Sequence, residues 1–150
     1  MTKILFVCLG NICRSPMAEF IMRDLVRQRG LEAAFEIASA ATSDEELGNP
    51  VYPPARRMLA AHGIDCAGKR AVQLTRADYD RYDLLFGMEQ RNVQRMRAIC
   101  GGDPAGKIAR LLDGTPRPRD IADPWYTGDF QSTWDDLLEG CTALLDRLGS

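Results

Sequence analysis

The sequence contains very little histidine, and its cysteines do not follow the spacing of metal-binding motifs. His62 is the single histidine, and none of the five cysteines forms a C-x-x-C pair. A structural zinc site is therefore hard to assemble from these residues, and catalysis that depends on a histidine has one candidate. His62 lies at the end of a helical pattern, where histidine commonly stabilises the helix C-terminus. We expect no metal and no cofactor, and we favour a structural role for His62.

Long apolar segments and a strong excess of charge are also absent. The apolar run near the N-terminus covers residues 4–8, which is too short for the core of a signal peptide, and no run approaches the roughly 20 residues of a membrane span. The odd number of cysteines argues against a framework of structural disulfides. The net charge is −2, so nothing attracts nucleic acid or acidic lipid in general. We expect a cytoplasmic protein that neither inserts into membranes nor binds nucleic acid.

Strand and helix patterns alternate along the chain. Such alternation is typical of parallel strands joined by right-handed crossovers. The sequence has 150 residues, no internal repeat and no linker, so a single domain over residues 1–150 is expected. The predicted fold is a three-layer α/β domain with a four-stranded parallel sheet flanked by helices. The expected strands are 3–8, 35–38, 83–88 and 108–112, and the expected helices are one that Ser15 caps, Pro16 begins and Gly30 ends, then 54–62, 89–99 and 130–148.

The segment from Cys8 to Ser15 connects the first strand to the first helix and has the features of an anion-binding loop. Gly10 and Asn11 can adopt left-handed backbone angles that turn the chain around an anion. Backbone amides can then point inward, and the helix N-terminus adds a favourable field. Arg14 supplies a planar guanidinium that binds two phosphate oxygens at once. The loop lies beyond the carboxyl end of a strand, where α/β sheets bind ligands.

Cys8 is the candidate nucleophile of this loop. Arg14 and the helix N-terminus favour its thiolate form, and Ser15 can donate a hydrogen bond to it besides capping the helix. The spacing between Cys8 and Arg14 has little weight alone, because Cys141 and Arg147 have the same spacing. That second pair lies inside the predicted last helix with no glycine between its members. It cannot cradle an anion, so Cys141 is expected in the core.

A carboxylate is the candidate proton donor for a leaving group. Asp123 precedes Pro124, which favours an extended backbone at Asp123 and so places it on a loop. Trp125 and Tyr126 follow directly and are expected to line an aromatic substrate cleft. From composition alone the Asp-Pro pair would only mark a turn. The loop at Cys8 favours the catalytic interpretation.

These motifs closely resemble those of the low-molecular-weight protein tyrosine phosphatases over essentially the whole chain. The matching stretches are V-C-L-G-N-I-C-R-S-P at 7–16, S-A-A-T-S-D at 39–44 and D-P-W-Y at 123–126. The resemblance implies a four-stranded parallel sheet and metal-independent hydrolysis of a phosphotyrosine protein or peptide, or of a small aryl phosphate, with inorganic phosphate as a product. We expect a monomer or a weak dimer.

The resemblance also implies a role for each matching residue. Cys8 would attack the phosphoryl group and become a phosphocysteine, and Asp123 would protonate the departing phenol and then activate water as a base. Arg14 and the loop amides would hold the phosphoryl oxygens. The residues implied to bind phosphate are Leu9, Gly10, Asn11, Ile12, Cys13, Arg14 and Ser15.

Supporting roles are implied for the residues around the nucleophile. In the family, Asn11 and Ser39 brace the loop, and Ser15 supports the thiolate. Cys13 can pair with Cys8 in a reversible, protective disulfide, which suits an exposed reactive thiol with a resolving partner. Simple packing is the alternative role for Cys13.

Several positions depart from the family pattern. Glu45 and Glu46 stand where relatives often carry an aromatic residue, and Leu47 is the apolar residue of that stretch. We expect Glu45 and Leu47 to line the substrate cleft, where an acidic rim should disfavour acidic phosphopeptides. Lys69 stands in a stretch where many relatives have histidine, and Glu89 stands where aspartate is usual.

Three other activities could use the same loop. Phosphoarginine phosphatases of this family tend to carry threonine at the position of Ile12, so Ile12 favours phosphotyrosine. A thiol-dependent arsenate reductase needs two further cysteines after the third strand, but residues 89–99 contain none and Cys100 is alone. A phosphate-binding module without turnover is disfavoured because the candidate nucleophile, arginine and acid are all present.

Overall fold

The computed structural model describes residues 1–149 and contains one parallel sheet of four strands in the order β2-β1-β3-β4. β1 lies in the middle, so its last residue, Cys8, pairs with Ala41 of β2, and Val7 pairs with Gly87 of β3. The predicted four-stranded parallel sheet is therefore confirmed. Its strands are β1 (Thr2–Cys8), β2 (Phe35–Ala41), β3 (Leu84–Gly87) and β4 (Ile108–Arg110).

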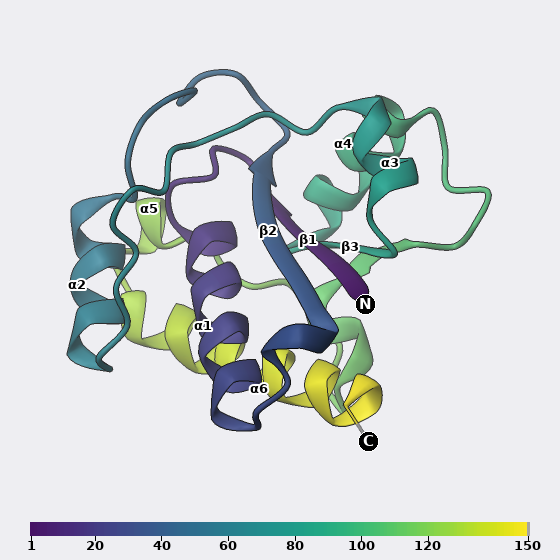
Figure 1. Ribbon diagram of the computed structural model, residues 1–150. Coiled ribbons are helices and arrows are strands. Elements are labelled where there is room, and N and C mark those ends of the chain that lie inside the picture. The colour runs from purple at the N-terminus through teal and green to yellow at the C-terminus, as the bar shows by residue number, and fades with distance from the viewer. Residues whose placement is uncertain (150) are drawn as a thin grey trace.

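Helices cover both faces of the sheet (Figure 1). α1, α2 and α6 pack on one face, and α3 and α4 pack on the other. No helix within residues 1–149 is long and apolar enough to cross a bilayer. The helices are α1 (Arg14–Gln28), α2 (Pro53–Ala61), α3 (Arg76–Arg81), α4 (Gln90–Cys100), α5 (Pro124–Thr127) and α6 (Phe130–Leu148), with short 3-10 turns η1 (Glu32–Ala34) and η2 (Leu111–Gly114).

The central strand supplies side chains to two hydrophobic cores. Ile4, Phe6 and Cys8 point into the core beneath α1, α2 and α6. Leu5 and Val7 point into the smaller core on the α3 and α4 side. This follows from the alternation of side chains along a strand. Cys8 is thus held at the carboxyl end of a strand that is buried on both faces.

The start of α1 differs from the prediction. The helix begins at Arg14 with Cys13 at its N-cap position, and Met17 N donates to Cys13 O at 3.1 Å. Ser15 therefore lies inside the first turn and does not cap the helix. The Ser15 hydroxyl instead contacts Cys8 Sγ and Asn11 Nδ2, and Pro16 is the third helical residue and not the first.

Two residues that were assigned structural roles occupy them. Cys141 is fully buried, and its burial raises the pKa of the thiol. His62 is the C-cap residue of α2 and stacks on Trp134, with ring centroids 3.7 Å apart. This stacking joins α2 to α6 and gives His62 a packing role.

Candidate active site

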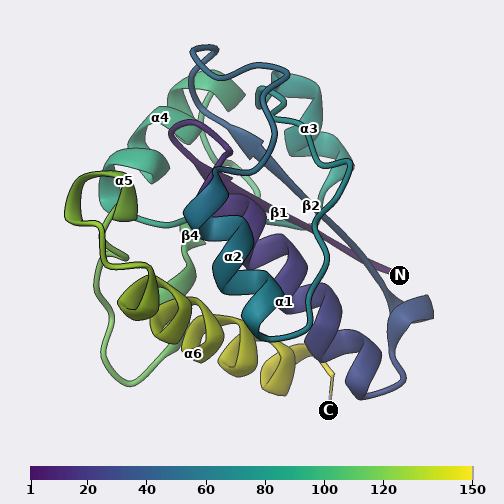
Figure 2. The same ribbon diagram turned by 90° about the vertical axis from the view of Figure 1, so that its left-hand side faces the viewer.

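A cavity of about 170 Å³ opens at the carboxyl edge of the sheet. The loop between β1 and α1 forms its floor, and α5 lies beside that loop (Figure 2). The cavity therefore brings together segments from the start, the middle and the end of the chain. Its lining residues are Cys8, Leu9, Gly10, Ile12, Cys13, Arg14, Glu45, Glu46, Asp123, Trp125 and Tyr126.

Asn11 fixes the turn of the loop. It is the one residue other than glycine with a positive φ within residues 1–149, a conformation that costs an asparagine about 1 kcal/mol. Its side chain offsets this cost with three hydrogen bonds. Nδ2 donates to Ser15 Oγ at 2.7 Å and to Ser39 Oγ at 3.0 Å, while Oδ1 accepts from Val72 N at 3.2 Å. Asn11 and Ser39 thus lie behind the loop, outside the cavity lining.

The sulfur of Cys8 lies at the bottom of the cavity, with 3% of the residue exposed. Ser15 Oγ is 3.0 Å from the sulfur, and Asn11 N donates to it at 3.4 Å. Hydrogen bonds of this kind stabilise a thiolate. Ser15 and Asn11 therefore contact the sulfur directly.

Arg14 is a buried cation between two carboxylates. The residue is 1% exposed, and Nη1 donates to Ile121 O at 2.9 Å. Its guanidinium lies 3.5 Å from a Glu89 oxygen and 3.4 Å from Asp123 Oδ2. The carbonyl and the two carboxylates fix the guanidinium plane beside the loop, where it can present donors to an anion.

Asp123 caps the short helix α5. Its Oδ1 accepts from Trp125 N at 3.0 Å, and its Oδ2 faces Arg14. Asp123 has the extended backbone predicted for the residue before Pro124 and lies outside the helix, which begins at Pro124. The cap holds the carboxyl group at the cavity wall.

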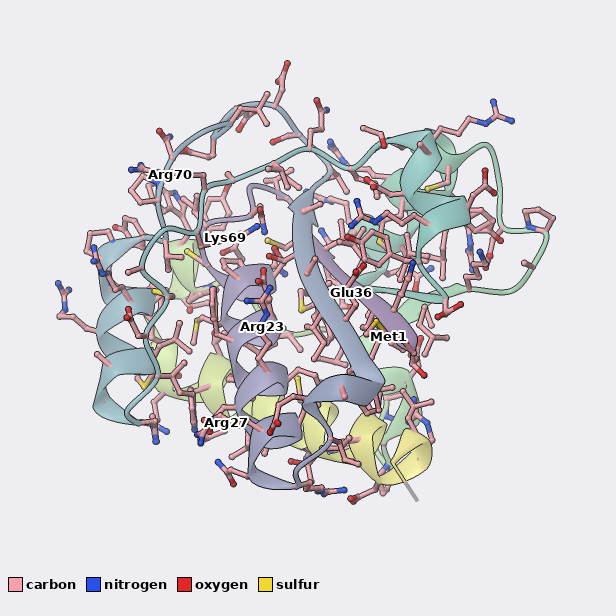
Figure 3. The ribbon with its side chains drawn as sticks, in the orientation of Figure 1. Met1, Arg23, Arg27, Glu36, Lys69 and Arg70 are labelled. Atoms are coloured by element: carbon pink, nitrogen blue, oxygen red, sulfur yellow. The ribbon has the colours of Figure 1, made fainter. Side chains whose placement is uncertain are left out.

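A charged cluster lies behind Ser39, on the far side of the loop. Ser39 Oγ donates to Glu19 Oε1 at 2.5 Å, and Lys69 Nζ donates to Ser39 O at 3.1 Å and lies 3.7 Å from Glu19. Arg23 completes the cluster, with Nη2 2.7 Å from Glu19 Oε2. In Figure 3, Lys69 lies next to the N-terminal end of α1, with Arg23 further along the helix. Burial lowers the pKa of Lys69, and the nearby Glu19 carboxylate opposes this shift.

Cys13 faces the same cavity as Cys8. Burial, followed by the negative charges of Cys8 and Asp123, raises the pKa of the Cys13 thiol to about 12. A thiol with this pKa is protonated at neutral pH, and the thiolate is the form that forms disulfides. A resolving role for Cys13 would therefore require the loss of this proton.

The cleft residues predicted from the sequence divide into two groups. Glu45, Trp125 and Tyr126 line the cavity, whereas Leu47 lies outside the lining with half of its surface exposed. A turn in which Leu47 N donates to Asp44 O directs Leu47 elsewhere.

Two residues that contact the site were not identified from the sequence. Ile121 bonds Arg14 through its backbone oxygen, which carries no sequence signal. Glu19 is 3% exposed and lies on α1 next to the buried Ala18. The sequence did offer one sign of a special role for Glu19, because it is a charged residue beside the apolar face of the predicted helix.

Comparisons with known proteins agree with this geometry. The family described as low molecular weight phosphotyrosine protein phosphatase matches residues 3–150. The low molecular weight protein-tyrosine-phosphatase YfkJ of Bacillus subtilis is 39% identical over 147 residues, 97% of this chain and 94% of YfkJ. PtpA of Staphylococcus aureus, described by the same words, is 35% identical over 149 residues, 99% of this chain and 94% of PtpA.

Solved structures show the same likeness. The crystal structure of YfkJ from Bacillus subtilis has a TM-score of 0.96 at 38% identity, covering 99% of this chain and 95% of YfkJ. The structure of DARP, a drosophila arginine phosphatase, has a TM-score of 0.90 at 26% identity and covers 99% of both chains. The family match and the named relatives place the chain among the protein tyrosine phosphatases, which are hydrolases. The chain belongs to the low molecular weight phosphotyrosine protein phosphatase family.

Proposed function

We propose that this chain hydrolyses phosphotyrosine in proteins or peptides, and small aryl phosphates, through a phosphocysteine formed on Cys8. The observation that carries the proposal is the arrangement around the Cys8 sulfur. Ser15 Oγ lies within hydrogen-bond distance of it, Asn11 N donates to it, Arg14 borders the same cavity, and Asp123 stands at the cavity wall.

The proposed reaction has two steps and uses no metal or cofactor. Cys8 Sγ forms a bond to phosphorus while the bond from phosphorus to the phenolic oxygen breaks, and Asp123 gives its proton to that oxygen. Water then attacks the phosphocysteine, Asp123 accepts a proton from the water, and the sulfur leaves as a thiolate. Inorganic phosphate is released.

Arg14 and the loop amides supply the electrostatic part of the proposal. The three equatorial oxygens carry the charge during phosphoryl transfer, and fixed donors stabilise that charge. Because the Arg14 guanidinium also lies 3.4 Å from Asp123 Oδ2, it links the bound phosphoryl group to the acid. We propose that Arg14 positions the phosphoryl group and the Asp123 carboxyl group relative to each other.

The cavity wall supports an aromatic substrate. Trp125 and Tyr126 are 51% and 78% exposed, and Tyr52 packs against Trp125 with ring centroids 4.7 Å apart. Exposed rings beside a phosphate site can sandwich a phenol. The likeness to an arginine phosphatase keeps phosphoarginine as the second candidate. Ile12 in the lining favours phosphotyrosine, and turnover of phosphotyrosine and phosphoarginine peptides compared side by side decides between them.

Cys8→Ser should abolish hydrolysis of p-nitrophenyl phosphate in the presence of EDTA, because a serine hydroxyl is not ionised at neutral pH. Cys66→Ser is the matched control, since Cys66 is equally buried but does not line this cavity. The control should keep its activity. Full activity of Cys8→Ser, or none in EDTA for the unaltered chain, contradicts the mechanism.

Asp123→Asn should slow the first step by about 10²–10⁴-fold on substrates whose phenol is a poor leaving group. The loss should shrink as the phenol becomes more acidic, because an acidic phenol departs without a proton. The measurement is kcat/KM for a series of substituted phenyl phosphates, because kcat/KM reports the step in which the phenol departs and not the later hydrolysis of the phosphocysteine. An equal loss across the series would reject Asp123 as the proton donor.

A further inference from the structure

A second cavity, of about 460 Å³, adjoins the phosphate cavity. The two share Leu9, Asp123 and Tyr126, so they form one continuous surface around the cleft. In Figure 2, α4 and α5 lie on the same side of the loop that follows β1. The other residues lining the second cavity are Glu89, Arg91, Asn92, Arg95, Asp120 and Thr127.

The three carboxylates of the second cavity already have partners, and Asp123 faces Arg14 at 3.4 Å. Glu89 lies 3.5 Å from Arg14. Asp120 accepts from Gln90 N at 2.9 Å and pairs with Arg110 at 3.0 Å. These acidic groups are therefore held by other partners of the chain.

The two arginines of the second cavity have no such partner. Arg91 and Arg95 are exposed and lie four residues apart on α4, so they project from the same side of the helix. Over residues 1–149, neither comes within ion-pair distance of a carboxylate. Like charges at this spacing repel and destabilise a helix. An external anion beside the cleft would relieve that repulsion.

The first cavity, which contains Cys8, carries negative charge on its wall, in contrast to the arginines of the second cavity. Glu45 and Glu46 line it, and neither forms an ion pair with a residue in 1–149. Glu46 Oε2 accepts from Asn49 Nδ2 at 2.6 Å, which leaves its charge in place. The surface therefore changes from acidic at Glu45 and Glu46 to basic at Arg91 and Arg95.

We propose that Arg91 and Arg95 form a subsite for an acidic side chain that flanks the phosphorylated residue of the substrate. Glu45 and Glu46 favour a basic residue on the opposite flank. This inference rests on the proposed function, because it names the peptides that the same site prefers. It also refines the expectation that an acidic rim disfavours acidic phosphopeptides: the effect depends on which flank carries the acid.

The test uses two peptides of identical composition around a central phosphotyrosine. One has two lysines before it and two glutamates after it, and the other has the reverse order. Because the cleft is polarised, one order should exceed the other in kcat/KM by about fivefold at low ionic strength, and the ratio should fall toward one in 0.5 M salt. Equal values for the two orders at low salt overturn the proposal.

Charge reversal identifies the residues. R91E/R95E should remove or invert the ratio between the two peptides, and a change common to both peptides cancels in that ratio. Arg97→Glu is the matched control, because Arg97 is exposed on the same helix but lines neither cavity, and it should keep the ratio. A ratio that survives in R91E/R95E, or disappears equally in Arg97→Glu, contradicts the assignment.

A binding experiment separates this inference from the proposed function. If the unaltered chain hydrolysed no aryl phosphate, the proposed function would fail. Calorimetric binding of the same two peptides to Cys8→Ser would still report the charge preference of the cleft. Equal dissociation constants there would overturn the subsite on their own.

Discussion

At the residue scale, a chain of hydrogen bonds connects Cys8 to charged side chains that lie outside the cavity. From Cys8, hydrogen bonds pass through Ser15 and Asn11 to Ser39, and from Ser39 to the buried Glu19. Lys69 and Arg23 both neutralise Glu19. Removal of Lys69 would leave Glu19 paired with Arg23 alone and would also remove the hydrogen bond to Ser39 O. The orientation of the loop therefore depends on a lysine well outside the cavity.

Lys69→Met should lower kcat for p-nitrophenyl phosphate by about 2- to 10-fold, the range expected for one net hydrogen bond. KM should change little, because Lys69 does not line the phosphate cavity. Lys69→His should restore much of kcat, since an imidazole can also donate to Ser39 O. Arg70→Met is the control: Arg70 is exposed, and its hydrogen bond goes to Gly48 O. Equal losses in Lys69→Met and Arg70→Met would assign the effect to the segment and not to Lys69.

The site residues differ in how far the sequence could reveal them. Cys8 and Arg14 lie in one short loop, so their motif was visible locally. Asp123 was identified because the leaving group needs a proton and the chain has one histidine. Ser39 came from the resemblance alone. Glu19 lies 20 residues from Ser39, and their hydrogen bond exists only because α1 packs against β2, which no local pattern specifies.

At the scale of elements, the sequence predicted those with a strong hydrophobic pattern. β1, β2, β3 and the longer helices each bury two or more apolar residues, whereas β4 buries only Ile108. α3 was missed because its six residues bury only Tyr79, and α5 was missed because it is four residues long and begins at a proline. The predicted fourth strand was too long, because the backbone enters η2 at Leu111. Short elements are set by caps and tertiary contacts, which weigh more there than periodicity.

Asp103 organises the connection between α4 and β4. Its carboxylate accepts from Tyr79 OH at 2.6 Å, Lys107 N at 2.7 Å and Ile108 N at 3.2 Å. Burial alone would raise the pKa of Asp103, but these hydrogen bonds lower it below the ordinary value of 3.8. The folded state therefore favours the carboxylate. Its stabilisation is complete above the unfolded-state pKa and is lost as the pH falls through the folded-state pKa.

Asp103→Asn should lower the free energy of unfolding at pH 7 by about 1–2 kcal/mol, because an amide cannot accept all three hydrogen bonds. The difference from the unaltered chain should shrink as the pH falls from 3.8 through the lower folded-state pKa, because protonation of Asp103 then removes the same acceptors. Urea unfolding at pH 7 and pH 3 measures both effects. Asp135→Asn is the control, since Asp135 accepts only from Gln131 on the helix surface. A pH-independent difference would reject the assigned role.

At the scale of the whole molecule, the loop that follows Cys8 joins β1 to α1, the two elements that the rest of the fold packs around. β1 pairs with two strands and contributes to both cores, and α1 packs against β1, β2, α2 and α6. An anion bound in the loop would contact residues at the end of β1 and the start of α1. Its binding free energy should therefore add to the stability of the entire domain.

Inorganic phosphate should raise the melting temperature of the whole domain in one transition. At 100 times its dissociation constant, phosphate adds about 2.7 kcal/mol, or about 5–10 °C for a chain of this size. Cys8→Ser should keep this shift, because it retains Arg14 and the loop amides. Arg14→Lys should lose most of it relative to its own melting temperature, because an ammonium cannot bind two oxygens in a plane. Sodium chloride at equal ionic strength controls for screening. The same shift with chloride, or in Arg14→Lys, would mean that phosphate acts elsewhere on the molecule.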